Sequence, residues 1–261
     1  MRRLALALLV LLLPLGAWAD EEVEPIAPDR ASASVSANTV GRGAFQLETG
    51  FAYLTERVGG APTERRFRIE AGLRAGVTER LELRIEGFPL IRVRGAEDET
   101  GNGDFLVGAK YRFIEAPKDS WLPSLGVFPF VKLPVAEEPL GSGKTDVGAL
   151  LLASFALPGQ LSLDLNAGLV AVGQLHPDGY LLQALVAAGL SRDVAESVTL
   201  FTDLVYASRD ERVGRDSVLV DLGAVWRPTR NIALDASVVT SLAGSGPDWA
   251  VRGGVSVRFG R

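Results

Sequence analysis

The sequence contains no cysteine, one methionine and one histidine. Without cysteine, neither a disulfide framework nor a lipid anchor on an N-terminal cysteine can form. A catalytic triad or a metal centre needs several convergent partners, and nothing in the sequence gathers them around His176. Beyond the N-terminal run, no apolar window approaches the roughly 20 residues of a membrane-spanning helix. We therefore predict no metal, no cofactor and no catalytic residue, and any membrane role must come from strands.

The N-terminus has the pattern of a secretory signal. Arg2 and Arg3 precede an apolar run from Leu4 to Leu15, and small residues at positions 17 and 19 form a cleavage site. We expect cleavage after Ala19, so that residues 1–19 are a signal peptide, with an uncleaved anchor as the alternative. The loss of Arg2 and Arg3 leaves 25 basic and 32 acidic residues, a charge of about −7, which argues against a nucleic-acid partner.

From Gly43 onward, apolar residues recur at every second position in segments of about ten residues, which is the period of a strand with one apolar face. No helical period is sustained. The sequence predicts twelve strands, an even number as bacterial single-chain barrels require. They cover residues 43–54, 65–77, 81–91, 103–113, 121–133, 145–156, 161–170, 180–191, 197–208, 216–226, 232–240 and 249–259.

The connections between these segments alternate between tighter turns and mostly longer loops, with both chain ends on the turn side. This is the outer-membrane arrangement, with short periplasmic turns and longer external loops. Residues 20–42 are acidic, then rich in alanine and serine, and show no period. We predict a flexible periplasmic segment there, acting as a spacer or, alternatively, as a partner-binding segment. Residues 43–261 are predicted to form the barrel.

Alternation alone does not decide whether the apolar face points into a soluble core or out into lipid. A twelve-stranded soluble barrel would enclose a core too wide for side chains to fill. Aromatic residues gather near strand ends, as interfacial girdles do, and the last strand ends on Phe259. We therefore predict an all-β, twelve-stranded antiparallel transmembrane barrel in the cell outer membrane, with lipid as its surroundings and a polar lumen.

The lumen face carries charges whose signs are segregated along the chain. The first strands supply mostly cations, the later strands supply aspartates, and the last strand restores two arginines. Two hypotheses remain open: a transverse field that orients polar solutes, or pairing of the charges across the lumen. The candidate lumen-lining residues are Arg66, Arg68, Arg74, Arg84, Lys110, Arg112, Lys132, Asp146, Asp164, Asp203, Asp221, Asp235, Arg252 and Arg258.

One stretch imitates a phosphate-binding loop. Gly141 to Thr145 reads GSGKT, but position 138, where the motif needs its first glycine, is glutamate, and the run enters a strand instead of a helix. Nucleotide binding is therefore not predicted.

Several barrel segments resemble one family of outer-membrane proteins. The segments are Gly103–Phe105 with Gly108–Phe113, Pro129–Pro134, Gly189–Arg192 and Gly254–Phe259. Together they are similar to proteins grouped under the putative MetA pathway of phenol degradation, whose members are commonly labelled transporters. The resemblance covers about residues 40–261. It implies a barrel and the uptake or export of small compounds, including hydrophobic or aromatic ones, and it transfers no site residue.

The sequence thus predicts a porin-like channel for passive passage of small solutes, without cofactor or enzyme activity. The alternative is a structural or adhesive barrel whose lumen is occluded, and an outer-membrane enzyme is the third class. The solute, the direction of movement and the oligomeric state do not follow from the sequence.

Overall fold

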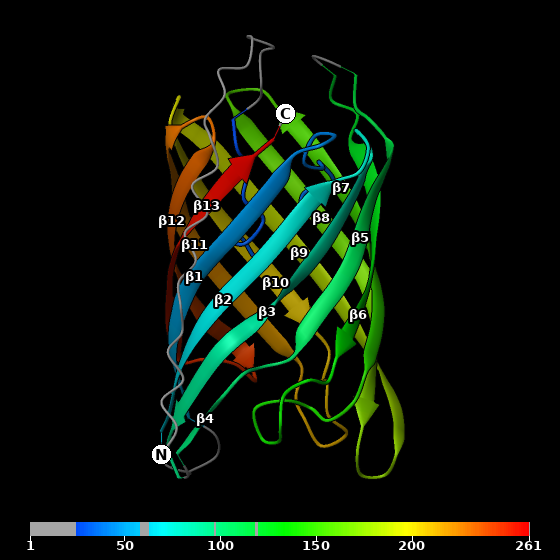
Figure 1. The fold of residues 1–261 in the computed structure, drawn as a ribbon, viewed down its shortest axis with the longest axis vertical. Coiled ribbons are helices and arrows are strands. Elements are labelled where there is room, and N and C mark those ends of the chain that lie inside the picture. Colours follow the sequence, from blue (N-terminus) through cyan, green and yellow to red (C-terminus); the bar gives the residue numbers. More distant parts are fainter. Residues whose placement is uncertain (1–24, 58–62, 97, 118–119, 261) are drawn as a thin grey trace.

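A computed structural model describes residues 25–57, 63–96, 98–117 and 120–260. These residues form one closed antiparallel barrel of twelve long strands, to which the three-residue strand β4 adds a short edge (Figure 1). The strands are β1 Phe45–Glu56, β2 Glu64–Gly76, β3 Leu81–Arg94, β4 Glu99–Gly101, β5 Phe105–Ile114, β6 Ser124–Leu133, β7 Asp146–Leu157, β8 Leu161–Gln174, β9 Gly179–Ala195, β10 Val198–Ala207, β11 Ser217–Thr229, β12 Ile232–Gly244 and β13 Trp249–Phe259. The predicted fold class is confirmed, since each predicted strand has its counterpart.

Each strand pairs with its neighbour in the chain, except that β3 pairs with β5 beside the short β4. The first and last strands close the barrel: Phe45 lies opposite Phe259, and Thr55 opposite Trp249. Closure removes the unpaired edges that an open sheet would expose. Every long strand therefore has a partner on both sides.

The two ends of the barrel differ in their connections. One end, the turn end, carries the turns at 77–80, 158–160, 196–197 and 230–231 and the start of β1; the other is the loop end. Three connections depart from the predicted pattern of tight turns at one end and longer loops at the other. The 115–123 connection at the turn end is long, and those at 175–178 and 245–248 are short, because β8 and β12 extend to Gln174 and Gly244.

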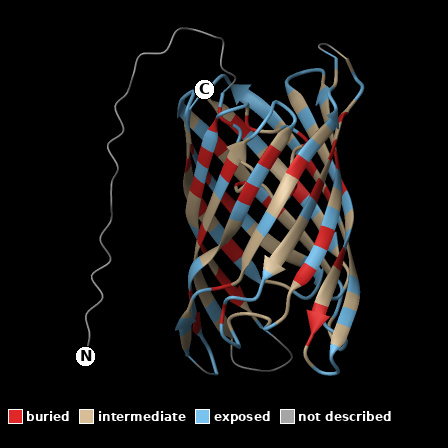
Figure 2. Ribbon diagram, turned by 45° about the vertical axis from the view of Figure 1, so that its right-hand side comes forward, coloured by how far each residue is buried: buried red, intermediate tan, exposed pale blue. Residues whose placement is uncertain are grey.

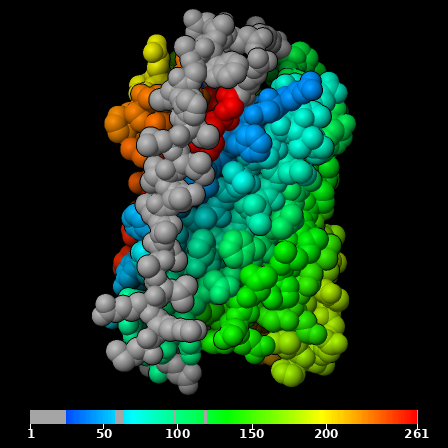
Figure 3. All heavy atoms as spheres, in the orientation of Figure 1, coloured from blue at the N-terminus to red at the C-terminus, as the bar shows by residue number. Residues whose placement is uncertain are grey.

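The apolar faces of the strands point outward. Buried and exposed positions alternate along the strands (Figure 2), and the exposed set is dominated by large hydrophobic side chains such as Leu151, Leu182 and Leu222. The outer surfaces of β2 and β3 form a continuous wall in the space-filling view (Figure 3). Such a surface is stable in lipid, because apolar side chains that face the hydrocarbon gain no free energy from being moved into the barrel interior. The soluble-barrel alternative is therefore wrong.

In the strands, most buried side chains are polar or charged, because they line the lumen. Glu82, Lys110 and Ser256 are fully buried, and Asp203 and Asp221 nearly so. Buried charges are costly unless partners satisfy them. The groups that pair with these buried charges make up the candidate site. Among the described residues, no helix is long and apolar enough to cross a membrane.

Candidate functional site

The described residues ahead of β1 lie inside the barrel. We call residues 25–44 the plug; they are the dark blue segment within the wall in Figure 1. The plug enters and leaves at the turn end. The Ile26 backbone N–H donates to the Arg230 carbonyl at 2.9 Å, and the Val40 N–H donates to Glu82 Oε2 at 2.9 Å. Between these two anchors the chain crosses the lumen.

The prediction of a flexible periplasmic segment is wrong for residues 25–42. Low hydrophobicity and the absence of a period are typical of disordered chain, because such a segment cannot build an apolar core. The lumen wall, however, is polar, so a segment of backbone amides, serines and small residues finds hydrogen-bond partners there. Residues 20–24 and the predicted signal peptide 1–19 lie outside the described residues.

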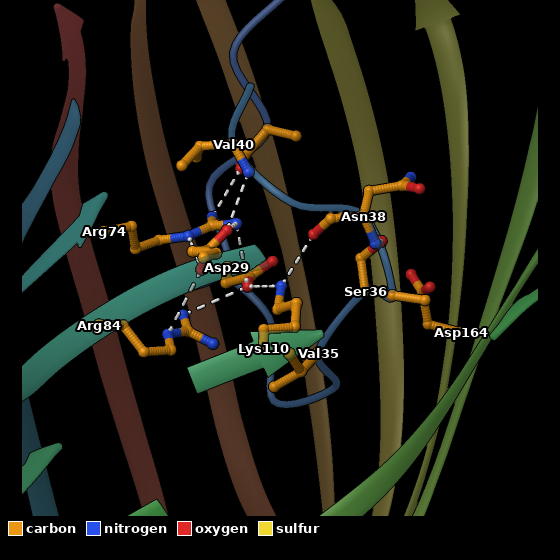
Figure 4. A network of polar contacts seen from close by, with 12 residues as sticks. Asp29, Val35, Ser36, Asn38, Val40, Arg74, Arg84, Lys110 and Asp164 are labelled. Atoms are coloured by element: carbon orange, nitrogen blue, oxygen red, sulfur yellow. Dashed lines mark hydrogen bonds and ion pairs between the residues drawn. The ribbon is translucent and has the colours of Figure 1, made fainter. Parts of the chain in front are cut away.

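Asp29 is the centre of the contacts on the basic wall. Its Oδ2 accepts a hydrogen bond from Lys110 Nζ at 2.6 Å and lies 3.2 Å from Arg84 Nη2 and 3.4 Å from Arg74 Nη2 (Figure 4). These cations come from three neighbouring strands, β5, β3 and β2. Lys110 also donates to the Asn38 carbonyl at 2.9 Å. One plug carboxylate thus joins three strands of the wall.

The charge state of Asp29 follows from these neighbours. Burial raises the pKa of the carboxyl, but Arg74, Lys110 and Arg84 outweigh this effect and hold the pKa well below its usual value. Asp29 is therefore ionised at neutral pH, as the ion pairs require.

Arg74 is itself shared between the plug and the wall. Its Nε and Nη2 donate to the two oxygens of Glu82 at 2.8 and 2.9 Å, while Nη1 reaches Glu48 Oε1 at 3.0 Å and the Ala27 carbonyl at 3.1 Å. A two-point contact with a carboxylate fixes the guanidinium in one orientation. Arg74 therefore presents a fixed edge to the plug.

The next plug residue, Arg30, contacts carboxylates from both walls of the lumen. Its guanidinium hydrogen-bonds Asp235 on β12 and lies 3.1 Å from Glu70 Oε2 on β2. Arg252 donates to the Arg30 carbonyl at 2.5 Å and to Asp221 Oδ2 at 3.2 Å. Two adjacent plug residues of opposite charge are thus each paired with wall groups of the complementary sign.

Small polar residues complete the crossing. The hydroxyls of Ser32 and Ser34 donate to Asp203 on β10 at 2.8 and 2.6 Å. The Asn166 side chain accepts from the Val35 N–H and donates to the Val35 carbonyl, each at 2.8 Å. Further along, the Ala37 N–H donates to Ser154 Oγ at 2.8 Å. The plug therefore contacts strands on every side of the lumen.

Glycines in the wall make room for the plug. A Cβ added at Gly189 would lie 2.0 Å from Ser34 Oγ, and one added at Gly254 would lie 2.2 Å from Arg30 Nη2. Both distances are far below any allowed contact, so a larger residue would displace the plug or deform the wall. Their close approach to the plug explains why glycine occupies these strand positions.

A cavity of about 390 Å³ lies between the plug and the wall formed by β2, β3 and β5. Val35, Phe88 and Leu106 supply apolar lining, and the guanidinium of Arg68 stacks 4.7 Å above the Phe88 ring. The lining also holds cations, among them Arg30, Arg84 and Arg252, and carboxylates, among them Glu70 and Asp104. The cavity therefore combines apolar surface with charged groups of both signs.

The predicted lumen charges separate into two groups. One group contacts the plug directly: Arg74, Arg84, Lys110, Arg112, Asp203, Asp235 and Arg252. The other group bonds to residues of the wall itself: Arg66 to Glu64, Arg68 to Glu70, Lys132 to Asp146, Asp164 to Ser154 and Asp221 to Arg252. Arg258 bonds instead to Asn231 in a turn. The two walls are largely joined through the plug, which neither charge hypothesis anticipated.

Sequence reasoning missed the plug residues and one wall cation. Strand β11 extends past the predicted end at residue 226, so Arg227 reaches the plug and donates to the Ile26 carbonyl at 2.8 Å. The adjacent opposite charges of Asp29 and Arg30 precede a series of strands with charged inner faces. This pair was the sequence signal that could have indicated a segment bound inside the lumen. His176 lies on an exposed turn, and no cluster of metal-ligating residues occurs in the described ranges.

Comparisons with known proteins agree with this architecture. The crystal structure of an outer membrane channel from Pseudomonas putida F1 matches with a TM-score of 0.69 at 15% identity, covering 90% of this chain and 100% of that one. The NanC porin matches with a TM-score of 0.57 at 11% identity, covering 81% and 98%. The KdgM porin matches with a TM-score of 0.54 at 12% identity, covering 82% and 99%. These likenesses show the fold. No curated protein matches the sequence significantly.

The family model described as "Putative MetA-pathway of phenol degradation" matches residues 28–259, a range that includes the plug from Pro28 onward. The match spans nearly all of the described chain. The chain therefore belongs to this family, and its fold is that of an outer-membrane barrel.

Proposed function

We propose that the barrel is a passive conduit for small solutes and that the plug controls passage through it. The observation that carries this proposal is the nature of the plug's attachment. It is held mostly by hydrogen bonds and ion pairs to a polar wall. Water can replace such contacts when they separate, whereas a segment packed by apolar surface would lose that burial on release.

The apolar contacts of the plug are few. Ile26 and Ala31 pack with Val225 and Ala233 near the turn end, and Ala37 packs with Phe128 and Leu152. Serine and alanine dominate residues 31–37. Small side chains leave the cavity beside β2, β3 and β5 open. A modest shift of the plug would extend this space along the wall.

The cavity supports a class of solute. Its volume of about 390 Å³ falls within the range of about 300–1,000 Å³ that is typical for small-molecule sites. Val35, Phe88 and Leu106 suit an aromatic or aliphatic body, and the arginines that line the same cavity suit an acceptor group such as a carboxylate. We infer that small apolar or aromatic solutes carrying an acidic group pass most readily.

A reversible cross-link tests the role of the plug. Ser36 Oγ lies 3.3 Å from Ser154 Oγ on β7, close enough for the double variant Ser36→Cys/Ser154→Cys to form a disulfide, whose sulfurs lie about 2.05 Å apart. The chain has no native cysteine, so oxidation affects only this pair. Conductance in planar bilayers and swelling of liposomes in benzoate would be measured before and after reduction.

We expect low conductance in the oxidised variant and recovery on reduction, while the single variants Ser36→Cys and Ser154→Cys do not respond. Equal conductance in both states would show that passage does not need plug movement. If the wild type and the reduced variant were both tight to ions and solutes, the barrel would be the occluded structural or adhesive protein instead.

A further inference from the structure

Three arginines gather on the outer face of the barrel at the loop end. Arg65 on β2 and Arg92 and Arg94 on β3 are exposed. On β3, Ile91 precedes Arg92 and Val93 separates Arg92 from Arg94, and both apolar residues are buried on the lumen side. Because side chains alternate between the two faces of a strand, Arg92 and Arg94 share the outer face. They differ from the lumen arginines described above, which face the plug.

The register places the three guanidinium groups close together. Arg65 lies directly opposite Arg94, and Arg92 lies opposite Phe67. Opposed residues of an antiparallel pair have Cα atoms about 4.5–5.5 Å apart, and alternate residues along a strand about 6.7 Å apart. Three long cationic side chains can therefore converge on one group.

Neighbouring aromatic residues mark the level of this cluster in the membrane. Phe67 lies opposite Tyr53, and the Tyr53 and Trp249 rings are 5.7 Å apart. Aromatic girdles lie at the boundary between the apolar band and the headgroups. On β3 the exposed Leu90 is the last apolar residue before Arg92 on the outer face. The arginines thus begin where the hydrocarbon ends, at the end with the external loops.

The charge of the cluster is only partly neutralised. Arg94 pairs with Asp98, an exposed contact. Within the described parts of the chain, Arg65 and Arg92 have no ion pair or side-chain hydrogen bond. Like charges directly opposite in a sheet are destabilising, so the Arg65–Arg94 pair is unfavourable unless an anion lies between them. A single interfacial arginine that extends to water would not need such a partner.

We propose that Arg65, Arg92 and Arg94 form a binding site for the phosphate of a phosphorylated glycolipid in the outer leaflet, of the lipid A class. Guanidinium groups bind phosphate oxygens through paired, charge-assisted hydrogen bonds. Phe67, level with Arg92, and Leu90 below it are positioned to contact the acyl chains of the same lipid. This site is independent of solute passage, because it lies on the opposite face of the wall.

The test is a lipid titration of the purified full-length barrel in detergent. Lipid A binding to the wild type, to Arg65→Gln/Arg92→Gln and to Arg192→Gln would be measured by thermophoresis. Arg192 is exposed near the turn end of β9 and serves as the matched control. One surface cation contributes about fivefold in affinity for an anionic membrane surface, so the double variant should bind lipid A about thirty-fold more weakly.

We expect the Arg192→Gln variant to bind lipid A with wild-type affinity. We also expect the wild type to bind dephosphorylated lipid A weakly, with about the affinity that the double variant has for intact lipid A. The mobility of unheated protein on a denaturing gel checks that each variant is folded. The proposal is overturned if the folded double variant binds lipid A as the wild type does, or if removing the phosphates leaves wild-type affinity unchanged.

Discussion

The replacement Asp29→Asn tests whether the plug is held by its charge. Asp29 accepts one hydrogen bond from Lys110 and faces Arg84 and Arg74. Removing one partner of a buried ion pair typically costs about 3–5 kcal/mol, because the remaining charge is left without compensation. The barrel wall keeps all of its strands and ladders in this variant. The cost therefore acts mainly on the docked state of the plug.

The expected shift is large. At about 1.4 kcal/mol for each factor of ten, a loss of 3–5 kcal/mol raises the ratio of released to docked plug by about 100-fold to 4,000-fold. A channel that opens rarely in the wild type should then conduct for much of the time. Single-channel recordings of open probability give this ratio directly, and liposome swelling gives the same comparison for uncharged solutes.

Two further variants make the result specific. Asp178→Asn removes an exposed loop carboxylate that pairs with Lys144, and exposed pairs contribute little, so conductance should not change. Lys110→Met added to Asp29→Asn removes an uncompensated cation and should recover part of the docking. If Asp29→Asn had wild-type open probability while remaining folded, the ion pairs would not be what holds the plug.

Three other predictions concern the same segment. Gly189→Val should raise conductance, because its side chain would occupy the place of the Ser34 hydroxyl; a variant with unchanged conductance would contradict the proposed fit. Ile26→Ala removes a fully buried side chain, costing about 2–5 kcal/mol, so limited proteolysis should cut residues 25–44 faster while the barrel stays intact; equal cleavage rates would argue against this anchor. The pKa of Asp29 is lowered from 3.8 in the docked plug, so the stabilisation that Asp29 contributes is complete above that value and is lost as pH falls; open probability should rise below about pH 4 in the wild type but not in Asp29→Asn, and an equal rise in that variant would assign the response to another group.

The barrel could be predicted because its strands repeat one simple rule. The alternation of residues such as Leu47, Phe51 and Tyr53 with polar neighbours sets the face of β1 whatever the rest of the chain does. Strand ends were less predictable. Residues 171–174 and 241–244 contain enough Gly, Gln and Ser to suggest loops, yet neighbouring strands hold them in the ladder.

The site was only half predictable. The inward positions of Lys110, Asp203 and Asp235 follow from strand parity, but their partners do not, because no local rule brings Asp29 or Arg30 to them. Asp235 lies 205 positions from Arg30 along the chain, and Asp203 lies 169 positions from Ser34. Contacts of this kind depend on closure of the whole barrel, so the sequence indicates charges in need of partners without naming them.

The last plug residues, Gly41 to Ala44, lead directly into β1, and this covalent connection determines how readily a released plug binds again. A released plug stays attached through a short tether and cannot move far from its site, so its effective local concentration remains in the millimolar range or above. It behaves as a tethered ligand of its own channel. In the proposed mechanism, any molecule that keeps the lumen open must therefore outcompete a ligand that cannot diffuse away.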